Sequence, residues 1–257
     1  MKVVILAGGY GTRLSEYTGV VPKPMVEIGD KPILIHIMNW YKSFGYNDFI
    51  VATGYKSEII NTYFENQIKS KDQEFNFLTG TQNQLSSIEE DFIVKTIYTG
   101  QNAMTGGRLL AVKKFIDEEE FMVTYGDGLS NINIPKLIEF HKSHKKIATI
   151  SAVRPLARFG ILNLNNNEVI SFKEKQQIDT GWINGGFFVF KKSIFKYLDN
   201  FSTILEREPL EKLARDGELM AYRHSGFWQC MDTKRDKDYL QNLWESGSYP
   251  WISSKKD

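Results

Sequence analysis

Residues 3–27 read VVILAGGYGTRLSEYTGVVPKPMVE, and this stretch decides how the rest of the chain is interpreted. Its first four residues, 3–6, are a short unbroken apolar run, which is typical of a strand buried on both faces of a parallel sheet. Gly8, Gly9 and Gly11 follow at once, and glycines allow a sharp bend that brings backbone amides close to a ligand. We therefore expect the strand to lead into a turn that faces a bound molecule.

Basic and hydroxyl side chains make a phosphate group the expected ligand of this turn. Arg13 supplies a planar guanidinium that matches phosphate geometry, and Thr12 adds a hydroxyl donor. Lys23 lies between Pro22 and Pro24, which restrict the backbone and so limit where the ammonium points. We interpret the stretch as a strand, a phosphate-binding turn and a positioned lysine. A tight surface turn is the alternative for the glycines taken alone.

The two commoner glycine loops are excluded by their spacing. A dinucleotide-binding loop needs a third glycine where Leu14 stands, and an acid about 20 residues further on that closes a second strand. The acid available, Glu27, follows Pro-Lys-Pro instead. A P-loop ends in Gly-Lys-Ser or Gly-Lys-Thr, whereas residues 11–13 read Gly-Thr-Arg.

Composition sets the class of protein. The 257 residues suffice for one large domain or two small ones, and a content of 42% hydrophobic and 25% charged residues is ordinary for a soluble chain. A net charge of +1 produces no long-range field, so we expect no nucleic-acid or membrane partner. Cys230 is the only cysteine, which permits no internal disulfide. Because no apolar run approaches about 18 residues, we expect a cytoplasmic protein.

Strand-like and helix-like segments alternate along the first 153 residues. Short apolar runs predict strands, and apolar residues at helical spacing predict helices between them. This alternation is typical of an α/β fold, so we expect a Rossmann-like, mostly parallel sheet with helices on both faces. The expected strands cover residues 3–6, 49–53, 92–98, 121–124 and 148–153, and the expected helices begin near residues 33, 57, 105 and 134.

Later segments differ in character. Residues 66–90 are polar without a strong period, which predicts a loop-rich insertion. Alternating apolar residues predict a smaller antiparallel meander beside the parallel sheet. Its expected strands are 159–164, 169–175 and 182–190, with a turn at 165–167. We further expect a helix over 204–216, a strand over 219–223, a last helix ending near residue 244, and a mobile end over 248–257.

A second glycine-containing loop, residues 99–108, carries candidate anion-binding groups. Gly106 and Gly107 place Arg108 near the start of a helix, where free amides and the helix dipole favour anions. Thr105 adds a hydroxyl to the same helix start. A solvated arginine is the alternative for Arg108.

Two aspartates are candidate metal ligands. Asp127 follows an expected strand beside Gly126, and the carboxyl ends of strands are where open α/β sheets bind ligands. Its carboxylate either neutralises the nearby basic residues or holds Mg²⁺ on substrate phosphates, and an ordinary turn residue is the alternative. Asp232 lies just ahead of the last expected helix, where it is either an N-cap or a second carboxylate of the same site.

Four further residues are candidates for a functional role. Glu174 and Lys175 end one expected strand, and Asn184 and Gly185 open the next, so both pairs are expected to face one cleft. Solvated surface charge is the alternative for Glu174 and Lys175.

Ala7 to Arg13, followed by Pro22-Lys23-Pro24-Met25, resembles the signature of the sugar-phosphate nucleotidyltransferases. The resemblance is strongest to the glucose-1-phosphate cytidylyltransferases and covers nearly the whole chain. It implies that the glycine loop wraps a nucleoside triphosphate and that Lys23 meets its phosphates. The nucleotide-binding residues that it implies are Leu6, Ala7, Gly8, Gly9, Tyr10, Gly11, Thr12, Arg13, Lys23, Ala103, Thr105, Arg108 and Gly126.

The resemblance also implies the reaction and its remaining residues. A sugar 1-phosphate, glucose 1-phosphate in the most similar enzymes, attacks the α-phosphorus of CTP, and pyrophosphate leaves in line. Asp127 and Asp232 would hold Mg²⁺, and Glu174, Lys175, Asn184 and Gly185 would bind the sugar phosphate. Because such transfer needs positioning and charge neutralisation rather than a nucleophilic side chain, Arg13, Lys23 and Asp127 are the expected catalytic residues.

Organisation and biological role follow from the same resemblance. We expect a single domain over 1–257, with a nucleotide-binding half at 1–153, a sugar-phosphate-binding half at 154–235 and a C-terminal helix and tail at 236–257. The relatives assemble as homo-oligomers, so a trimer or hexamer is expected, and they serve polysaccharide biosynthesis. Ala103 and Gln176 depart from the family pattern, which has serine and proline at these positions.

Three alternatives stay open at this point. The phosphorylated acceptor can be another sugar, a polyol or a small metabolite. The chain can be a binding module without turnover, although mere binding needs no paired carboxylates. It can also be a glycosyltransferase, which uses metal-binding aspartates but does not need the glycine loop with Arg13 and Lys23.

Overall fold

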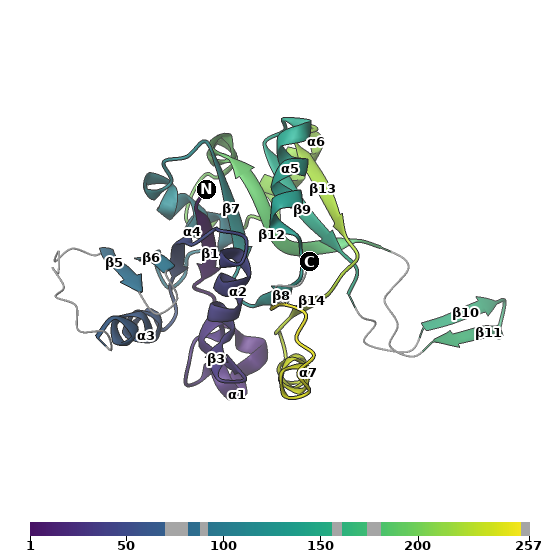
Figure 1. Ribbon diagram of the computed structural model, residues 1–257. Helices are drawn as coiled ribbons and strands as arrows, with labels where there is room; N and C mark the ends of the chain where they lie inside the picture. Colours follow the sequence, from purple (N-terminus) through teal and green to yellow (C-terminus); the bar gives the residue numbers. More distant parts are fainter. Residues whose placement is uncertain (70–81, 88–91, 156–160, 174–180, 253–257) are drawn as a thin grey trace.

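The computed structural model describes residues 1–69, 82–87, 92–155, 161–173 and 181–252 (Figure 1). The central sheet is made of β1 (Val3–Ala7), β4 (Asp48–Thr53), β5 (Gln82–Ser87), β6 (Phe92–Tyr98), β7 (Glu120–Tyr125), β9 (Ala148–Val153), β12 (Ile183–Lys191) and β13 (Leu219–His224). Its order is β13-β9-β12-β7-β1-β4-β6-β5. Only β5 and β12 pair antiparallel with their neighbours, so the expected mostly parallel sheet is confirmed.

Helices cover both faces of this sheet (Figure 1). They are α1 (Ser15–Thr18), α2 (Ile33–Lys42), α3 (Ser57–Lys69), α4 (Thr105–Val112), α5 (Ile134–His144), α6 (Glu208–Arg215) and α7 (Lys234–Glu245). Short 3₁₀ helices are η1 (Thr12–Leu14), η2 (Lys23–Met25), η3 (Lys113–Phe115) and η4 (Lys192–Tyr197). None of the described helices is long and apolar enough to cross a bilayer.

The apolar run of β1 is explained by its two buried faces. Val3 and Ile5 pack in one hydrophobic cluster with residues of α2, α3, α5 and α7. Val4 and Leu6 pack in a second cluster with residues of α4 and α6. Successive side chains of a strand point to opposite faces, so a strand covered on both sides must be apolar at every position.

The position of β1 also locates the ligand site. The chain passes from β1 to β4 on one side and later returns to β7 on the other side of β1. The loops that follow β1 and β7 therefore leave the sheet side by side, and Gly126 donates from its amide to the Leu6 carbonyl at 3.1 Å. Such a reversal of strand order is where open α/β sheets bind ligands.

The expected meander is corrected in the placement of its third strand. β10 (Ile161–Asn165) and β11 (Glu168–Lys173) pair as an antiparallel hairpin that projects from the body (Figure 1). β12 instead lies in the central sheet between β7 and β9. The reason is burial on both faces, because the apolar run from Phe187 to Phe190 is at most 2% exposed. Such a run belongs in the middle of a sheet rather than in a half-exposed hairpin.

The expected loop-rich insertion at residues 66–90 is corrected in part. α3 continues to Lys69, and β5 pairs antiparallel with β6 along its whole length. The sequence of β5, QNQLSS, has no apolar alternation because it is an edge strand that depends on backbone pairing. Residues 70–81 and 88–91 lie outside the described part of the chain. α3 begins at Ser57, where a helix start was expected.

The C-terminal segment is packed rather than mobile as far as residue 252. Trp251 is only 1% exposed, and its ring lies 5.6 Å from that of Phe227. Its indole N–H donates to His36 Nδ1 of α2 at 3.3 Å. The sequence showed no period here because the burial is carried by single aromatic residues, including Tyr249, rather than by a regular element.

Arg108 ties together the loops at the carboxyl end of the sheet. The side chain starts in the first turn of α4 and is only 4% exposed. Its guanidinium donates five hydrogen bonds of 2.7–3.2 Å, to the carbonyls of Gly8, Thr53, Gly100 and Gln101 and to the Thr99 hydroxyl. These acceptors lie at the end of β4 or just after β1 and β6, so one buried cation fixes the ends of three strands relative to one another. Burial lowers the pKa of this guanidinium.

Gly8 is required by this contact rather than by its own backbone angles. A Cβ placed on Gly8 would lie 2.1 Å from Arg108 Nη1, whereas a Cβ on Gly9 would have nothing within 4 Å. The neighbouring Gly54 is under the same constraint, because its Cβ would lie 2.3 Å from the same nitrogen. The loop therefore needs a glycine at residue 8 to pack on the guanidinium.

Gly8→Ala is expected to destabilise the protein by about 1–3 kcal/mol, the usual cost of overpacking a filled site. The matched control Gly9→Ala should stay within about 0.5 kcal/mol of wild type, because its methyl group meets open space. Urea unfolding of the three proteins measures both free energies. Equal stability of the two variants would contradict the packing role assigned to Gly8.

Candidate active site

A large cleft opens at the carboxyl ends of β1 and β7. Its volume is about 1430 Å³, and it is lined by the loops that follow these strands, by the start of α4 and by β12. From the C-terminal segment it is lined by Trp228, Gln229, Cys230, Asp232, Thr233, Arg235, Asp236 and Tyr239. Sites for one small molecule usually measure roughly 300–1,000 Å³. The cleft is therefore large enough for two ligands side by side, with the glycine loop on one wall and β12 on another.

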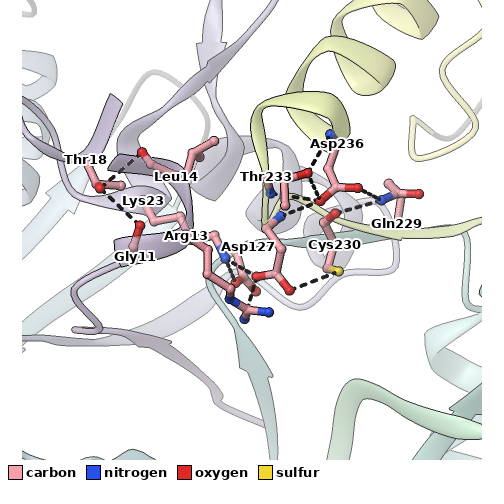
Figure 2. Close-up of polar contacts among 11 residues, drawn as sticks. Gly11, Arg13, Leu14, Thr18, Lys23, Asp127, Gln229, Cys230, Thr233 and Asp236 are labelled. Carbon is pink, nitrogen blue, oxygen red and sulfur yellow. Dashed lines mark hydrogen bonds and ion pairs between the residues drawn. The ribbon is translucent and has the colours of Figure 1, made fainter. Parts of the chain in front are cut away.

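Lys23 joins two carboxylates at the centre of this cleft. Its ammonium lies 2.6 Å from Asp127 Oδ2 and 2.6 Å from Asp232 Oδ1. Arg13 also donates to Asp232 Oδ1, at 3.0 Å. Figure 2 shows the side chains of Arg13 and Lys23 coming from the N-terminal segment, with Asp127 beside them. The two carboxylate oxygens share one donor, so they lie no further apart than twice 2.6 Å.

The flanking prolines place Lys23 as the sequence predicted they would. Pro22 is extended, with ψ of 150°, and Pro24 lies within the single turn of η2, which begins at Lys23. The amide of Met25 closes this turn on the Pro22 carbonyl at 2.8 Å. Lys23 as a whole is only 9% exposed. A buried ammonium needs acceptors, and the two aspartates supply them.

A small two-stranded sheet brings the aspartates together. β8 (Gly128–Ser130), directly after Asp127, pairs antiparallel with β14 (Trp228–Cys230), which ends two residues before Asp232. The Met231 amide extends this pairing by donating to the Asp127 carbonyl at 2.8 Å. This register places Asp127 opposite Met231, so Asp232 lies one residue further on and close to Asp127, although the two aspartates are far apart in the sequence.

Asp232 is not the N-cap of α7. Thr233 caps the helix, and its hydroxyl accepts from the Asp236 amide at 3.3 Å. The Asp236 carboxylate in turn accepts from the amides of Asp232 and Thr233 at 3.1 and 2.8 Å (Figure 2). This capping box satisfies the helix start by itself and leaves the Asp232 carboxylate directed at Lys23.

For both Lys23 and Asp232, the ion pairs together shift the pKa further than burial does, and in the opposite direction. Burial works to lower the pKa of Lys23, but Asp127 and Asp232 raise it above the ordinary lysine value. Burial works to raise the pKa of Asp232, but Lys23 and Arg13 lower it below the ordinary value. Both groups are therefore charged at neutral pH. Burial raises the pKa of the neighbouring Cys230 thiol to about 12, so this thiol is protonated there.

A second polar network crosses the cleft wall. Glu206 accepts from the Thr105 hydroxyl at 2.6 Å and from the Tyr125 hydroxyl. The Asn184 amide donates to the same Tyr125 oxygen at 3.1 Å, while the Asn184 carbonyl accepts from the Gly186 amide at 2.8 Å. This network joins the start of α4, the end of β7 and β12. Burial and Glu206 raise the pKa of Tyr125.

A register shift in β12 gives Asn184 its place in this network. The ladder with β9 is interrupted between Asn184 and Phe188, and Gly186 has a φ of +77°. Irregularities of this kind re-aim side chains next to active sites. Gly185 lies in the same interruption, and its carbonyl accepts from the Trp228 indole N–H at 2.7 Å.

The structure gathers the predicted site residues that it describes along one cleft. They are Leu6, Ala7, Gly8, Gly9, Tyr10, Gly11, Thr12, Arg13, Lys23, Ala103, Thr105, Arg108, Gly126, Asp127, Asn184, Gly185 and Asp232. Glu174 and Lys175 lie outside the described residues, as does Gln176. Arg108 differs from expectation in its surroundings, since its guanidinium is occupied by the loop carbonyls.

Three cleft residues were not singled out from the sequence. Tyr125 stands two residues before Asp127, so proximity to a candidate ligand was a usable signal. Trp228 lies on β14 beside the segment of Asp232, which is a weaker signal of the same kind. Glu206 is brought to the cleft by the connection ahead of α6, and no local pattern marks it.

The described residues fit a metal ion that arrives with its substrate. The described part of the chain contains no group of three or more His, Cys, Asp or Glu side chains that could hold a metal ion by themselves. Asp127 and Asp232 offer two converging carboxylates. Mg²⁺ is commonly bound by one or two carboxylates together with substrate phosphates and water, so this donor set suits it.

Comparisons with solved structures agree with the fold. HddC from Yersinia pseudotuberculosis has a TM-score of 0.70 at 27% identity, over 95% of this chain and 99% of that one. A second structure of HddC was solved in complex with GMP-PN. A UDP-glucose pyrophosphorylase in complex with UDP-glucose has a TM-score of 0.68 at 18% identity, which supports the fold alone.

Comparisons of sequence extend over nearly the whole chain. A glucose-1-phosphate cytidylyltransferase of Salmonella typhimurium is 50% identical over 253 residues, which is 98% of each chain. A probable glucose-1-phosphate cytidylyltransferase of Bacillus subtilis is 42% identical over 253 residues, with 98% of this chain and 99% of that protein covered. The family model described as nucleotidyl transferase matches residues 2–241. The chain therefore belongs to the nucleotidyl transferase family.

Proposed function

We propose that the chain is a glucose-1-phosphate cytidylyltransferase, which joins CTP and α-D-glucose 1-phosphate to give CDP-glucose and pyrophosphate. The observation that carries this proposal is the pair of carboxylates bridged by a buried lysine beside the glycine loop. The choice of CTP and glucose 1-phosphate is supported by the names of the two cytidylyltransferases that are 50% and 42% identical. Because both alignments cover nearly all of this chain and of each relative, this support applies along the whole chain.

The nucleotide would bind along the glycine loop. Gly8 to Gly11 present backbone to the cleft at the switch point of the sheet, where anionic ligands are held by amides. Arg13 has a side chain that is 69% exposed and only one contact with Asp232 in the described residues, so it can turn its fork to the triphosphate. Tyr10, whose hydroxyl donates to Asn102 at 2.6 Å, would border the nucleotide on the outer side.

The transfer itself needs no covalent intermediate. The sugar phosphate oxygen attacks the α-phosphorus and pyrophosphate leaves, so the residues must align two anions and offset their charge. Lys23 and Arg13 would stabilise the triphosphate and the departing pyrophosphate. Mg²⁺ held by Asp127 and Asp232 would supply further neutralisation of the phosphate charge. Asn184 and Gly185 would face the sugar phosphate from the opposite wall.

Further parts of the proposal extend beyond the cleft. Glu174 and Lys175 are proposed to bind the sugar phosphate, as the family resemblance implies. A cytoplasmic location, a role in polysaccharide biosynthesis and a homo-oligomer are proposed on the same ground. Light scattering coupled to gel filtration would test for a trimer or hexamer, and a monomer would contradict that part.

Pyrophosphate release tests the substrates directly. We expect release with CTP, Mg²⁺ and glucose 1-phosphate to exceed release with ATP, GTP or UTP, and to fall when another sugar 1-phosphate replaces glucose 1-phosphate. The same panel separates the alternatives. Release with a different pair would correct the substrates, and release with none would favour a binding module. Loss of sugar from a nucleotide sugar would favour a glycosyltransferase.

Asp127→Asn is expected to lower kcat by about 10²–10³, the usual loss when one group that stabilises transition-state charge is removed. The matched control is Asp238→Asn on α7, where the carboxylate is 46% exposed and pairs only with Lys234 among described residues. The control should retain wild-type kcat. Circular dichroism would verify that both variants fold, and near-normal turnover by Asp127→Asn would refute the role given to this residue.

A further inference from the structure

We propose that Lys23 excludes divalent metal from the free protein, so that Asp127 and Asp232 accept a metal ion only when a nucleotide has drawn the ammonium away. This inference rests on the proposed function, because it assigns an order of binding to that same site. Lys23 would then act twice, first as an internal counter-ion of the carboxylates and then as a ligand of the phosphates.

The geometry shows that the ammonium occupies the space between the carboxylates. Lys23 Nζ is 2.6 Å from one oxygen of Asp127 and 2.6 Å from one oxygen of Asp232. The lysine side chain is 11% exposed, and those of Asp127 and Asp232 are 26% and 15% exposed. No second cation can enter between these two oxygens while Nζ is there, and burial restricts access to the rest of each carboxylate.

The balance of charge favours the same order. Asp127 and Asp232 carry two negative charges, and Lys23 and Arg13 offset them with two positive charges. A divalent ion added to this set would leave two unbalanced positive charges in a half-buried site, where charges are screened less than in water. A nucleoside triphosphate brings enough negative charge to balance both the ion and the two basic side chains.

The lysine has a short path from the carboxylates to the phosphates. A Cβ built on Gly11 would lie 3.2 Å from the Cβ of Lys23, so the stem of the lysine passes directly beside the glycine loop. Lysine has a flexible four-carbon stem and three donors, which lets the ammonium change partners without movement of the backbone. The Lys23 ammonium can therefore reach either the two carboxylates or phosphates bound at the glycine loop within the length of its own side chain.

The test measures binding of Mn²⁺ to the full chain without nucleotide. Binding is monitored as the loss of the free Mn²⁺ signal in electron paramagnetic resonance. Mn²⁺ serves as the probe because it shares the oxygen ligands of Mg²⁺. Lys23→Met, which keeps the length but removes the charge, is expected to bind Mn²⁺ at least about tenfold tighter than wild type, or about 1.4 kcal/mol. The control Lys56→Met removes a charge outside the cleft and should bind as wild type does.

A double variant shows whether the gain belongs to the proposed carboxylates. Lys23→Met combined with Asp232→Asn should lose the tenfold gain. Wild-type binding as tight as that of Lys23→Met, or a gain that survives in the double variant, would overturn the inference. Lys23→Gln replaces Lys23→Met if circular dichroism shows that the methionine variant does not fold.

Failure of this inference is distinct from failure of the proposed function. If wild type releases pyrophosphate from CTP and also binds Mn²⁺ tightly in the absence of nucleotide, only the order of binding is refuted. A tenfold gain in Lys23→Met together with no pyrophosphate release from any substrate pair would refute the cytidylyltransferase and leave the exclusion of metal by Lys23 intact.

Discussion

The contact of one buried ammonium with two carboxylates is the interaction on which the site depends. Lys23 comes from the turn after the glycine loop, Asp127 from the end of β7, and Asp232 from the segment ahead of α7. Each charge is buried far enough that it needs the others, because an unpaired buried charge is costly. The three segments are therefore held at mutual positions that suit a ligand carrying phosphates.

The sheet supplies the constraint that keeps this contact in place. β1 is buried on both faces, so neither it nor the loop that follows can shift without disturbing two hydrophobic clusters. Arg108 adds a second anchor by bonding to carbonyls at the end of β4 and just after β1 and β6. A glycine loop is intrinsically flexible, and the bond from Arg108 to the Gly8 carbonyl holds the start of this loop against the end of the sheet.

Local patterns predicted the parts of the fold that have a regular period, and the residue types of the glycine loop together with the family resemblance predicted the candidate site. The apolar run of β1 and the prolines around Lys23 each indicated one structural role, and the structure agrees. β12 was assigned to the wrong sheet because an apolar strand does not indicate which strands pair with it. The burial of Trp251 was missed because a single aromatic residue has no period. Arg108 was expected to face an anion. The carbonyls that surround it instead come from strands that are distant in the sequence, so no local pattern indicated them. The meeting of Asp127 with Asp232 depends on the pairing of β8 with β14, which no local signal encodes.

The most direct measurement is a crystal structure with a non-hydrolysable CTP analogue and Mn²⁺, read by anomalous scattering at the manganese edge. The account predicts an anomalous peak bonded to oxygens of Asp127 and Asp232 and to a phosphate. It also predicts that the Lys23 ammonium has moved from the carboxylates to the triphosphate on the glycine loop. A peak away from both aspartates, or phosphates bound elsewhere while Lys23 keeps its two carboxylate contacts, would contradict it.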